Sequence, residues 1–174
     1  MKINPKAIRS ICFTALFAAI ICVCTFISVP LPIGYFNLGD AAVLLCAWTL
    51  GPLCGAIAAA IGSALADVFI GYVLYAPATA VIKALMAVCA YFLSAVLLRI
   101  IKKPSLAFVP RAISAIAAEM IMISGYFIYE FAVLSYGLGA AASLLGNTLQ
   151  AVCGAVIGTT VAAILHKRFI KHNT

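Results

Sequence analysis

The chain has 174 residues, of which 67% are hydrophobic and only 9% are charged, and its net charge is +7. A soluble domain carries roughly 25% charged residues and could not hide this much apolar surface, so the composition predicts an all-α, polytopic membrane protein that forms one domain over residues 1–174. The basic residues flank hydrophobic runs and form no basic face with interleaved aromatic side chains, which excludes a nucleic-acid partner and indicates a lipid bilayer.

The first predicted span covers residues 6–28 and ends before two prolines that cannot continue a helix. Its length and the lack of an Ala-x-Ala cleavage site favour a retained helix over a cleaved signal peptide. A loop over residues 29–38 follows, and Asp40 is expected to cap the next helix. That helix ends near Gly51 and is short for a bilayer, so a re-entrant or strongly tilted segment is the alternative to a full span.

Four longer spans are predicted at residues 53–72, 76–99, 108–134 and 140–168. With the N-terminus inside the cell, six spans place all three basic clusters on the cytoplasmic side, whereas five or seven do not. The clusters are Lys2, Lys6 and Arg9; Arg99, Lys102, Lys103 and Arg111; and Lys167, Arg168 and Lys171.

Small residues recur at four-residue spacing, which lets helix backbones approach closely in a membrane. Ala15 and Ala19 of the first span are the candidates for an outward face that docks another membrane protein. The others are expected to pack inside the bundle: Gly55, Ala59 and Ser63, and Gly154 and Gly158. The seven cysteines lie in apolar runs and are expected to be small buried residues without a metal.

Charged residues within spans are costly and usually face a cavity or a partner, so each is a functional candidate. The chain has only four acids, and one lysine, Lys83, lies far from the basic clusters. An Asp67–Lys83 ion pair without any ligand is the structural alternative for two of them. Glu119, in the middle of its span, is expected to matter less than Glu130.

Depth along the helices brings a set of polar and aromatic side chains to one level below the outer surface. Such a mixture suits a small polar, aromatic ligand, although the tyrosines also fit the role of interface anchors. The candidate ligand-binding residues are Asn37, Asp67, Tyr72, Tyr75, Lys83, Tyr126, Glu130, Asn147 and Gln150. No phosphate-binding loop, metalloprotease or serine-hydrolase motif is present, so neither an enzyme nor a cofactor is predicted.

Several stretches together carry a family resemblance. They are Tyr35–Ala42 (YFNLGDAA), Gly51-Pro52 followed by Gly55, Gly62–Asp67 (GSALAD) with Gly71-Tyr72, and Ala76–Lys83 (APATAVIK). The combination resembles the substrate-specific S component of energy-coupling factor (ECF) vitamin transporters.

The resemblance implies six helices, cytoplasmic termini and a vitamin site near the outer face of the cell membrane. It also implies a transmembrane coupling protein and two ATPase subunits as partners, with the first helix docking through an Ala-x-x-x-Ala surface that Ala15 and Ala19 match. Vitamin B6 or hydroxymethylpyrimidine is the first expectation for the ligand and riboflavin the second, because the tryptophan-rich pattern of thiamine-specific members is missing. A stand-alone secondary transporter or channel, and a ligand-free membrane assembly subunit, stay open as alternatives.

Overall fold

Six α-helices make up most of the computed structural model, which describes residues 5–30, 35–101 and 108–172. Lys2, Lys102 and Lys103 of the predicted basic clusters lie outside the described residues. In chain order the elements are α1 (Pro5–Phe26), β1 (Ser28–Pro30), β2 (Tyr35–Asn37), α2 (Gly39–Leu50), α3 (Pro52–Ile70), α4 (Ala76–Ile100), α5 (Val109–Ile128), the π-helix η2 (Tyr129–Val133), the 3-10 helix η3 (Gly137–Ala140) and α6 (Ala141–His172).

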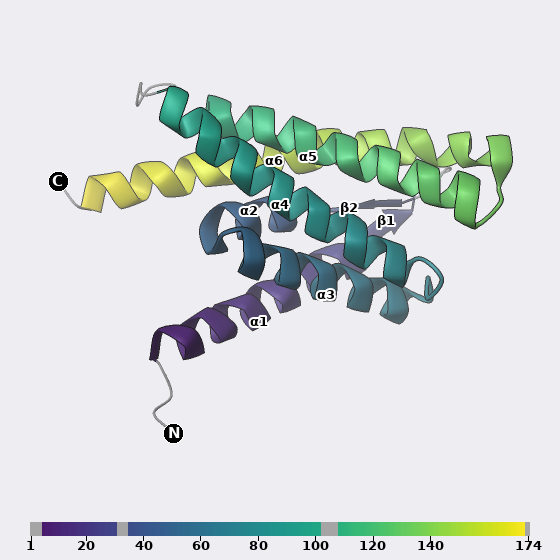
Figure 1. Cartoon of the computed structure of the whole chain (residues 1–174), viewed down its shortest axis with the longest axis horizontal. Coiled ribbons are helices and arrows are strands. Elements are labelled where there is room, and N and C mark those ends of the chain that lie inside the picture. Colours follow the sequence, from purple (N-terminus) through teal and green to yellow (C-terminus); the bar gives the residue numbers. More distant parts are fainter. Residues whose placement is uncertain (1–4, 31–34, 102–107, 173–174) are drawn as a thin grey trace.

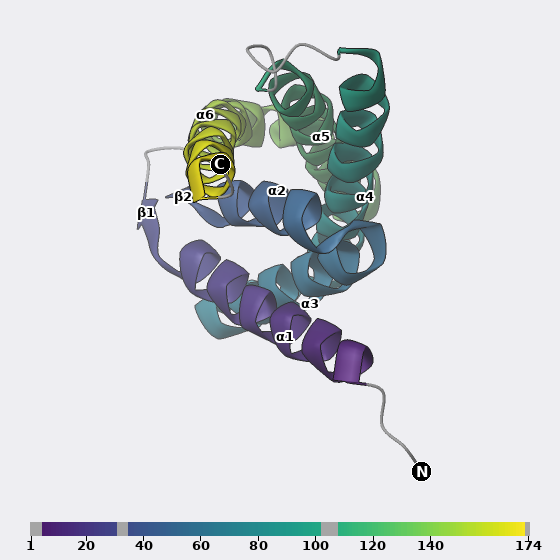
Figure 2. The same ribbon diagram turned by 90° about the vertical axis from the view of Figure 1, so that its left-hand side faces the viewer.

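Within the described residues, five helices are long and apolar enough to cross a membrane, and α2 is not among them. Its 12 residues extend for about 18 Å, well short of the ~30 Å hydrocarbon core. Figure 2 shows α2 lying across the centre of the bundle, and it contacts α1, α3, α4 and α6. The sequence-based alternative of an incomplete span therefore describes α2 better than a full crossing.

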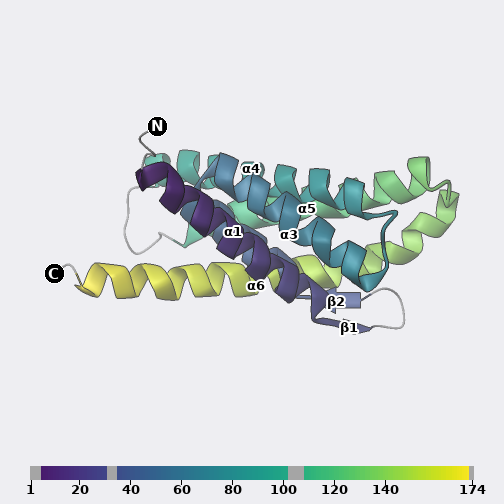
Figure 3. The same cartoon turned by 90° about the horizontal axis from the view of Figure 1, so that it is seen from below.

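The long helices run back and forth between two ends of the molecule (Figures 1 and 3). The first turn of α1, the end of α4, the start of α5 and the last turns of α6 lie toward one end. The β-hairpin and the turn between α3 and α4 lie toward the other. The helix ends that carry the described residues of the three predicted basic clusters therefore lie toward one end of the molecule.

Two glycines make the sharp changes of direction around α3. Gly51 has φ of 85° and separates α2 from α3, which starts with Pro52 in its first turn. Gly71 has φ of 95° and ends α3, with its amide donating to the carbonyls of Asp67 and Val68. Only glycine adopts these backbone angles without a steric cost, so the chain can reverse within a few residues at both places.

The short hairpin of β1 and β2 replaces the loop that the sequence predicted after α1. Ser28 pairs with Asn37, Val29 with Phe36 and Pro30 with Tyr35 in antiparallel register. The amide of Leu38 then donates to the carbonyl of Cys24 in α1, 3.2 Å away. The hairpin thus returns the chain to α1 and delivers Asn37 to the bundle interior, where it is buried.

Small residues bring the helices together at close range, as predicted. A side chain at Gly62 of α3 would collide with the carbonyl oxygen of Ala18 in α1, and one at Gly55 would lie 3.0 Å from the Cα of Ala47 in α2. Gly154 and Gly158 of α6 both face α2. Every one of these contacts is inside the bundle.

Ala15 and Ala19 behave differently from their neighbour Ala18. Both are exposed, whereas Ala18 is buried against the core. They line an apolar groove between α1 and α3 whose walls include Ile57, Ile61 and Leu65 of α3. Ala15 and Ala19 therefore face outward from the bundle, as predicted.

The topology can be tested with single cysteines in a variant that lacks the seven native ones. A cysteine at Ser105, beside the Lys102–Lys103 cluster, is expected to react with a membrane-impermeant reagent only after cells are permeabilised. A cysteine at Val73, which is exposed in the turn between α3 and α4, is expected to react in intact cells. Labelling of Ser105→Cys from outside would overturn the predicted orientation.

Candidate ligand-binding site

A cavity of about 310 Å³ opens among the hairpin, α3, α4, η2, η3 and α6. All nine candidate ligand residues from the sequence line it, although they come from distant parts of the chain. The nine are Asn37, Asp67, Tyr72, Tyr75, Lys83, Tyr126, Glu130, Asn147 and Gln150. The fold therefore brings together one group of polar and aromatic side chains that the sequence grouped by depth alone.

The ammonium of Lys83 forms an ion pair with Asp40 of α2. Both side chains are almost fully buried, with 5% and 0% of their surface exposed. The predicted pairing of Lys83 with Asp67 is thus wrong, because the start of α2 lies directly against the face of α4 that carries Lys83. The predicted cap is also wrong: Leu38 is the N-cap residue and makes no side-chain bond, and Asp40 lies inside the first turn.

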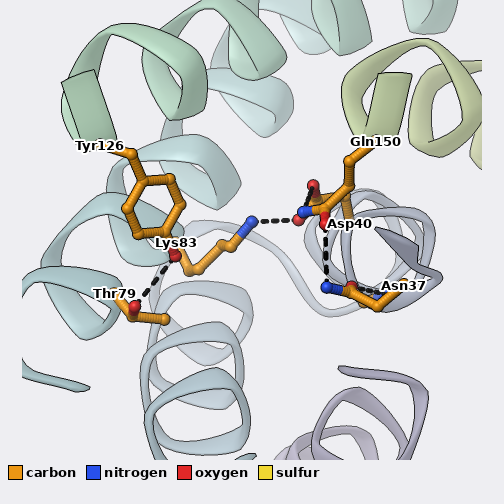
Figure 4. A network of polar contacts seen from close by, with 7 residues as sticks. Asn37, Asp40, Thr79, Lys83, Tyr126 and Gln150 are labelled. Carbon is orange, nitrogen blue, oxygen red and sulfur yellow. Dashed lines mark hydrogen bonds and ion pairs between the residues drawn. The ribbon is translucent and has the colours of Figure 1, made fainter. Parts of the chain in front are cut away.

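A chain of amide hydrogen bonds holds the other side of Asp40 in place (Figure 4). Gln150 Nε2 donates to Asp40 Oδ2 over 2.7 Å, and Asn37 Nδ2 donates to Gln150 Oε1 over 2.9 Å. Asn37 Oδ1 in turn accepts from the amide of Gly39 over 2.8 Å. This Asp40–Lys83 network joins β2, α2, α4 and α6 at the wall of the cavity.

Tyr126 lies on the other side of Lys83 (Figure 4). The Lys83 ammonium lies 5.6 Å from the centre of the Tyr126 ring, a cation–π distance. The Tyr126 hydroxyl and the Thr79 hydroxyl are hydrogen-bonded at 2.9 Å. The Tyr126 ring, which lines the cavity, is therefore held by contacts with both Lys83 and Thr79.

Glu130 enters the cavity from the π-helix at the end of α5. In this wide turn the amide of Leu134 donates to the carbonyl of Tyr129, five residues earlier. Such turns often occur at functional sites because they redirect one side chain. Glu130 is buried and accepts hydrogen bonds from the hydroxyls of Tyr75 (3.3 Å) and Ser143.

Three tyrosine rings form the rim beside Glu130. Tyr75 is in edge-to-face contact with Tyr72, at 5.9 Å between ring centres, and with Tyr129, at 5.7 Å. The Tyr129 hydroxyl donates to the carbonyl of Leu74. The turn between α3 and α4 is thereby attached to the start of η2, and the rings of Tyr72 and Tyr75 line the cavity.

Two buried carboxyl groups have oxygens without a hydrogen-bond partner among the described residues. Asp67 lines the cavity, is 4% exposed, and its Oδ2 makes no hydrogen bond. Glu119 does not line the cavity, is 3% exposed, and neither of its oxygens is hydrogen-bonded. Gly154 makes room for it, since a side chain there would meet both Glu119 and Asp40.

A comparison with known protein families shows which class of protein this chain belongs to. The family model described as ECF-type riboflavin transporter, S component, matches residues 6–167 of the chain. The chain belongs to this S-component family. The resemblance inferred from the sequence is therefore confirmed, and the S component is a multi-pass protein of the cell membrane and the substrate-binding membrane subunit of an ECF vitamin transporter.

The chain is also similar to one curated protein. A protein of Pyrococcus woesei, described as an uncharacterized protein in gap 3'region, is 34% identical to the S component over 142 residues. The match covers 82% of the S component and 89% of the relative. The similarity thus extends over most of both chains.

Sequence reasoning missed several residues that line the cavity of the S component: Thr25, Thr79, Tyr136, Gly139, Ala142, Ser143 and Gly146. Helical spacing carried a usable signal for two of them. Thr79 precedes Lys83 by four residues, and Ser143 precedes Asn147 by four, so each shares a helix face with a predicted residue. Thr25 gave no such signal, because its place in the wall depends on how α1 meets the start of α2.

The partner of Lys83 can be tested by charge removal in the purified S component. Lys83→Met is expected to lower stability by about 3–5 kcal/mol, because Asp40 is left as a buried charge without a cation. Adding Asp40→Asn should restore most of the loss, whereas adding Asp67→Asn should not. Thermal unfolding in detergent measures the stability of all three variants. If Asp40→Asn and Asp67→Asn restored the stability of Lys83→Met equally, the pairing of Lys83 with Asp40 would be contradicted.

Proposed function

We propose that the S component captures a small heteroaromatic vitamin or vitamin precursor from outside the cell and passes it to an ATP-driven importer. The observation that carries this proposal is the convergence of nine polar and aromatic side chains around one cavity in an otherwise apolar bundle. Aromatic walls with a few fixed polar groups are what a site for a flat, polar ring requires.

The size of the cavity favours a compact ligand. About 310 Å³ is at the lower end of the roughly 300–1,000 Å³ of small-molecule sites. A single-ring ligand of the vitamin B6 or hydroxymethylpyrimidine type is therefore the first choice. Riboflavin is the second candidate, and the description of the matching family favours it.

The energy for import is proposed to come from partner subunits, a transmembrane coupling protein and two ATPases. The groove between α1 and α3 is the proposed docking surface for the coupling protein. Ala15 and Ala19 contribute only methyl side chains to this groove, so a partner helix can approach the α1 backbone closely. Exposed apolar side chains of α1, such as Ile11 and Val23, extend the same surface.

Uptake in proteoliposomes tests the proposed function. The S component reconstituted with the coupling protein and ATPases is expected to accumulate one of labelled pyridoxine, hydroxymethylpyrimidine or riboflavin when ATP is present, and none with a non-hydrolysable analogue. Mass spectrometry of the molecule released from gently purified protein should identify the same compound. Uptake by the S component alone would indicate a secondary transporter or channel, and neither binding nor uptake would indicate an assembly subunit.

Bulky substitutions in the groove test the docking surface. Ala15→Leu and Ala19→Leu are expected to leave ligand affinity unchanged but to abolish uptake, because a leucine holds the partner helix away. Ala141→Leu is the matched control, since Ala141 is exposed but lines neither the groove nor the cavity. Calorimetry measures affinity and the proteoliposome assay measures uptake. Full uptake by both groove variants would place docking elsewhere.

A further inference from the structure

The charge balance around the cavity is uneven. Lys83 lines the cavity, but its charge is offset by Asp40, which lies behind the wall and is fully buried. This is the one ion pair found in the described part of the chain. The other two ionisable acid groups of the wall, Asp67 and Glu130, form no ion pair with a described residue, although the charge of Lys83 also acts on Asp67 from a greater distance. The cavity is therefore an acidic site even though it contains a lysine.

Asp67 is the carboxyl group of the wall with an unmet hydrogen-bonding capacity. Its Oδ2 is buried and makes no hydrogen bond, whereas Glu130 accepts from Tyr75 and Ser143. Asp67 also belongs to the last turn of α3, which ends at Ile70. Backbone carbonyls gather at that end of a helix, so the helix dipole does not favour a negative charge there. An unpaired buried oxygen is costly, so a ligand that supplies a hydrogen-bond donor to this wall of the cavity would be stabilised there.

We propose that the cavity selects amino-substituted nitrogen heterocycles, and that Asp67 recognises the amino group and the ring nitrogen beside it. An exocyclic amine and an adjacent protonated ring nitrogen present two parallel N–H donors, the same fork that an arginine offers to a carboxylate. A 4-aminopyrimidine has this arrangement when N3, the ring nitrogen beside its amino group, is protonated, which a nearby carboxylate favours. Riboflavin has no amino group. The inference rests on the proposed function and narrows its ligand class.

The same charge balance disfavours phosphorylated ligands. A phosphate group would bring up to two negative charges close to Asp67 and Glu130 in a partly desolvated site. Lys83 is not available to offset them, because separating it from Asp40 would leave a buried charge without a partner. The site thus discriminates by repulsion as well as by attraction, and it accepts the unphosphorylated form of a precursor.

Three matched compounds test this selectivity on the purified S component. The probes are 4-amino-5-hydroxymethyl-2-methylpyrimidine, its 4-oxo analogue and its phosphate ester, with riboflavin as a fourth ligand. Calorimetry is expected to give an affinity for the amino compound at least ~10-fold above that for the oxo compound, as for a charge-assisted hydrogen bond. The phosphate ester and riboflavin should bind more weakly still.

Asp67→Asn is expected to reduce the amino-to-oxo preference by roughly 10- to 100-fold. A carboxamide pairs better with the oxo form, which offers one N–H donor and one carbonyl acceptor. Glu119→Gln is the matched control, because it makes the same chemical change at a buried acid that does not line the cavity. The amino-to-oxo preference of Glu119→Gln should equal that of the parent protein.

The outcomes separate the inference from the proposed function. If the parent protein binds riboflavin, the oxo compound or the phosphate ester more tightly than the amino compound, the selectivity is wrong but a ring-binding subunit remains. The same holds if Asp67→Asn folds and keeps the parent preference. If the parent protein binds none of the four compounds, and no small molecule is released from it, the proposed function itself fails. If Asp67→Asn does not fold, the relative affinities of the parent protein for the four compounds still test the proposed selectivity.

Discussion

A lysine ammonium deep in a membrane bundle needs a counter-charge, and the arrangement of the S component follows from how Lys83 obtains one. Its partner, Asp40, is carried by a different helix, and the second carboxylate oxygen of Asp40 is held by Gln150 of a third. Asn37 then fixes Gln150 and the start of α2 at once. In a medium of low dielectric constant, each of these bonds is stronger than in water, and each missing bond is costlier. Satisfying one ammonium group thus sets the relative positions of the hairpin, α2, α4 and α6.

A short helix across the centre of the bundle is possible because small residues make room for it. Gly55 of α3 and Gly158 of α6 lie against the backbone of α2 on two sides. Gly154 lets Asp40 and Glu119 come close together. Most residues of α2 are buried among the other helices, which keeps much of its backbone away from lipid, where polar groups would have no hydrogen-bond partner. The apolar helices around it form the barrier, and the polar groups gather inside them.

Much of this architecture could be predicted because composition and periodicity report directly on membrane spans. The limits of the long helices agree with prediction to within a few residues at most ends, since prolines and glycines mark them. Depth could also be predicted, because the rise per residue is constant along a helix, and it grouped the residues that the cavity brings together. The direction in which a side chain points around the bundle could not be predicted. Asp67 was the predicted partner of Lys83, and the packing of α2 placed Asp40 there instead.

Local features without a sequence signature were missed for similar reasons. The wide turn at Tyr129–Val133 is composed of residues that suit an ordinary helix, so its redirection of Glu130 could not be foreseen. The three-residue strands of the hairpin are too short for an alternating pattern, and one of them ends in a proline. Both features are set by contacts between distant segments. The likeness to a known family predicted the class of protein, while the contacts of individual side chains required the fold.

The position of Gly62 has a mechanical consequence for α1. Among its described residues, this helix buries only Ala18, Ile21 and Thr25 in the bundle, and its backbone at Ala18 lies so close to Gly62 that a side chain there would collide with the Ala18 carbonyl. That contact acts as a pivot between the proposed docking groove, represented by Ala15, and Thr25 in the cavity wall. The two lever arms are about 4.5 Å and 10.5 Å long at ~1.5 Å per residue. A tilt that shifts Ala15 therefore moves Thr25 about twice as far, so the fold magnifies a small displacement at the docking surface into a larger one at the ligand.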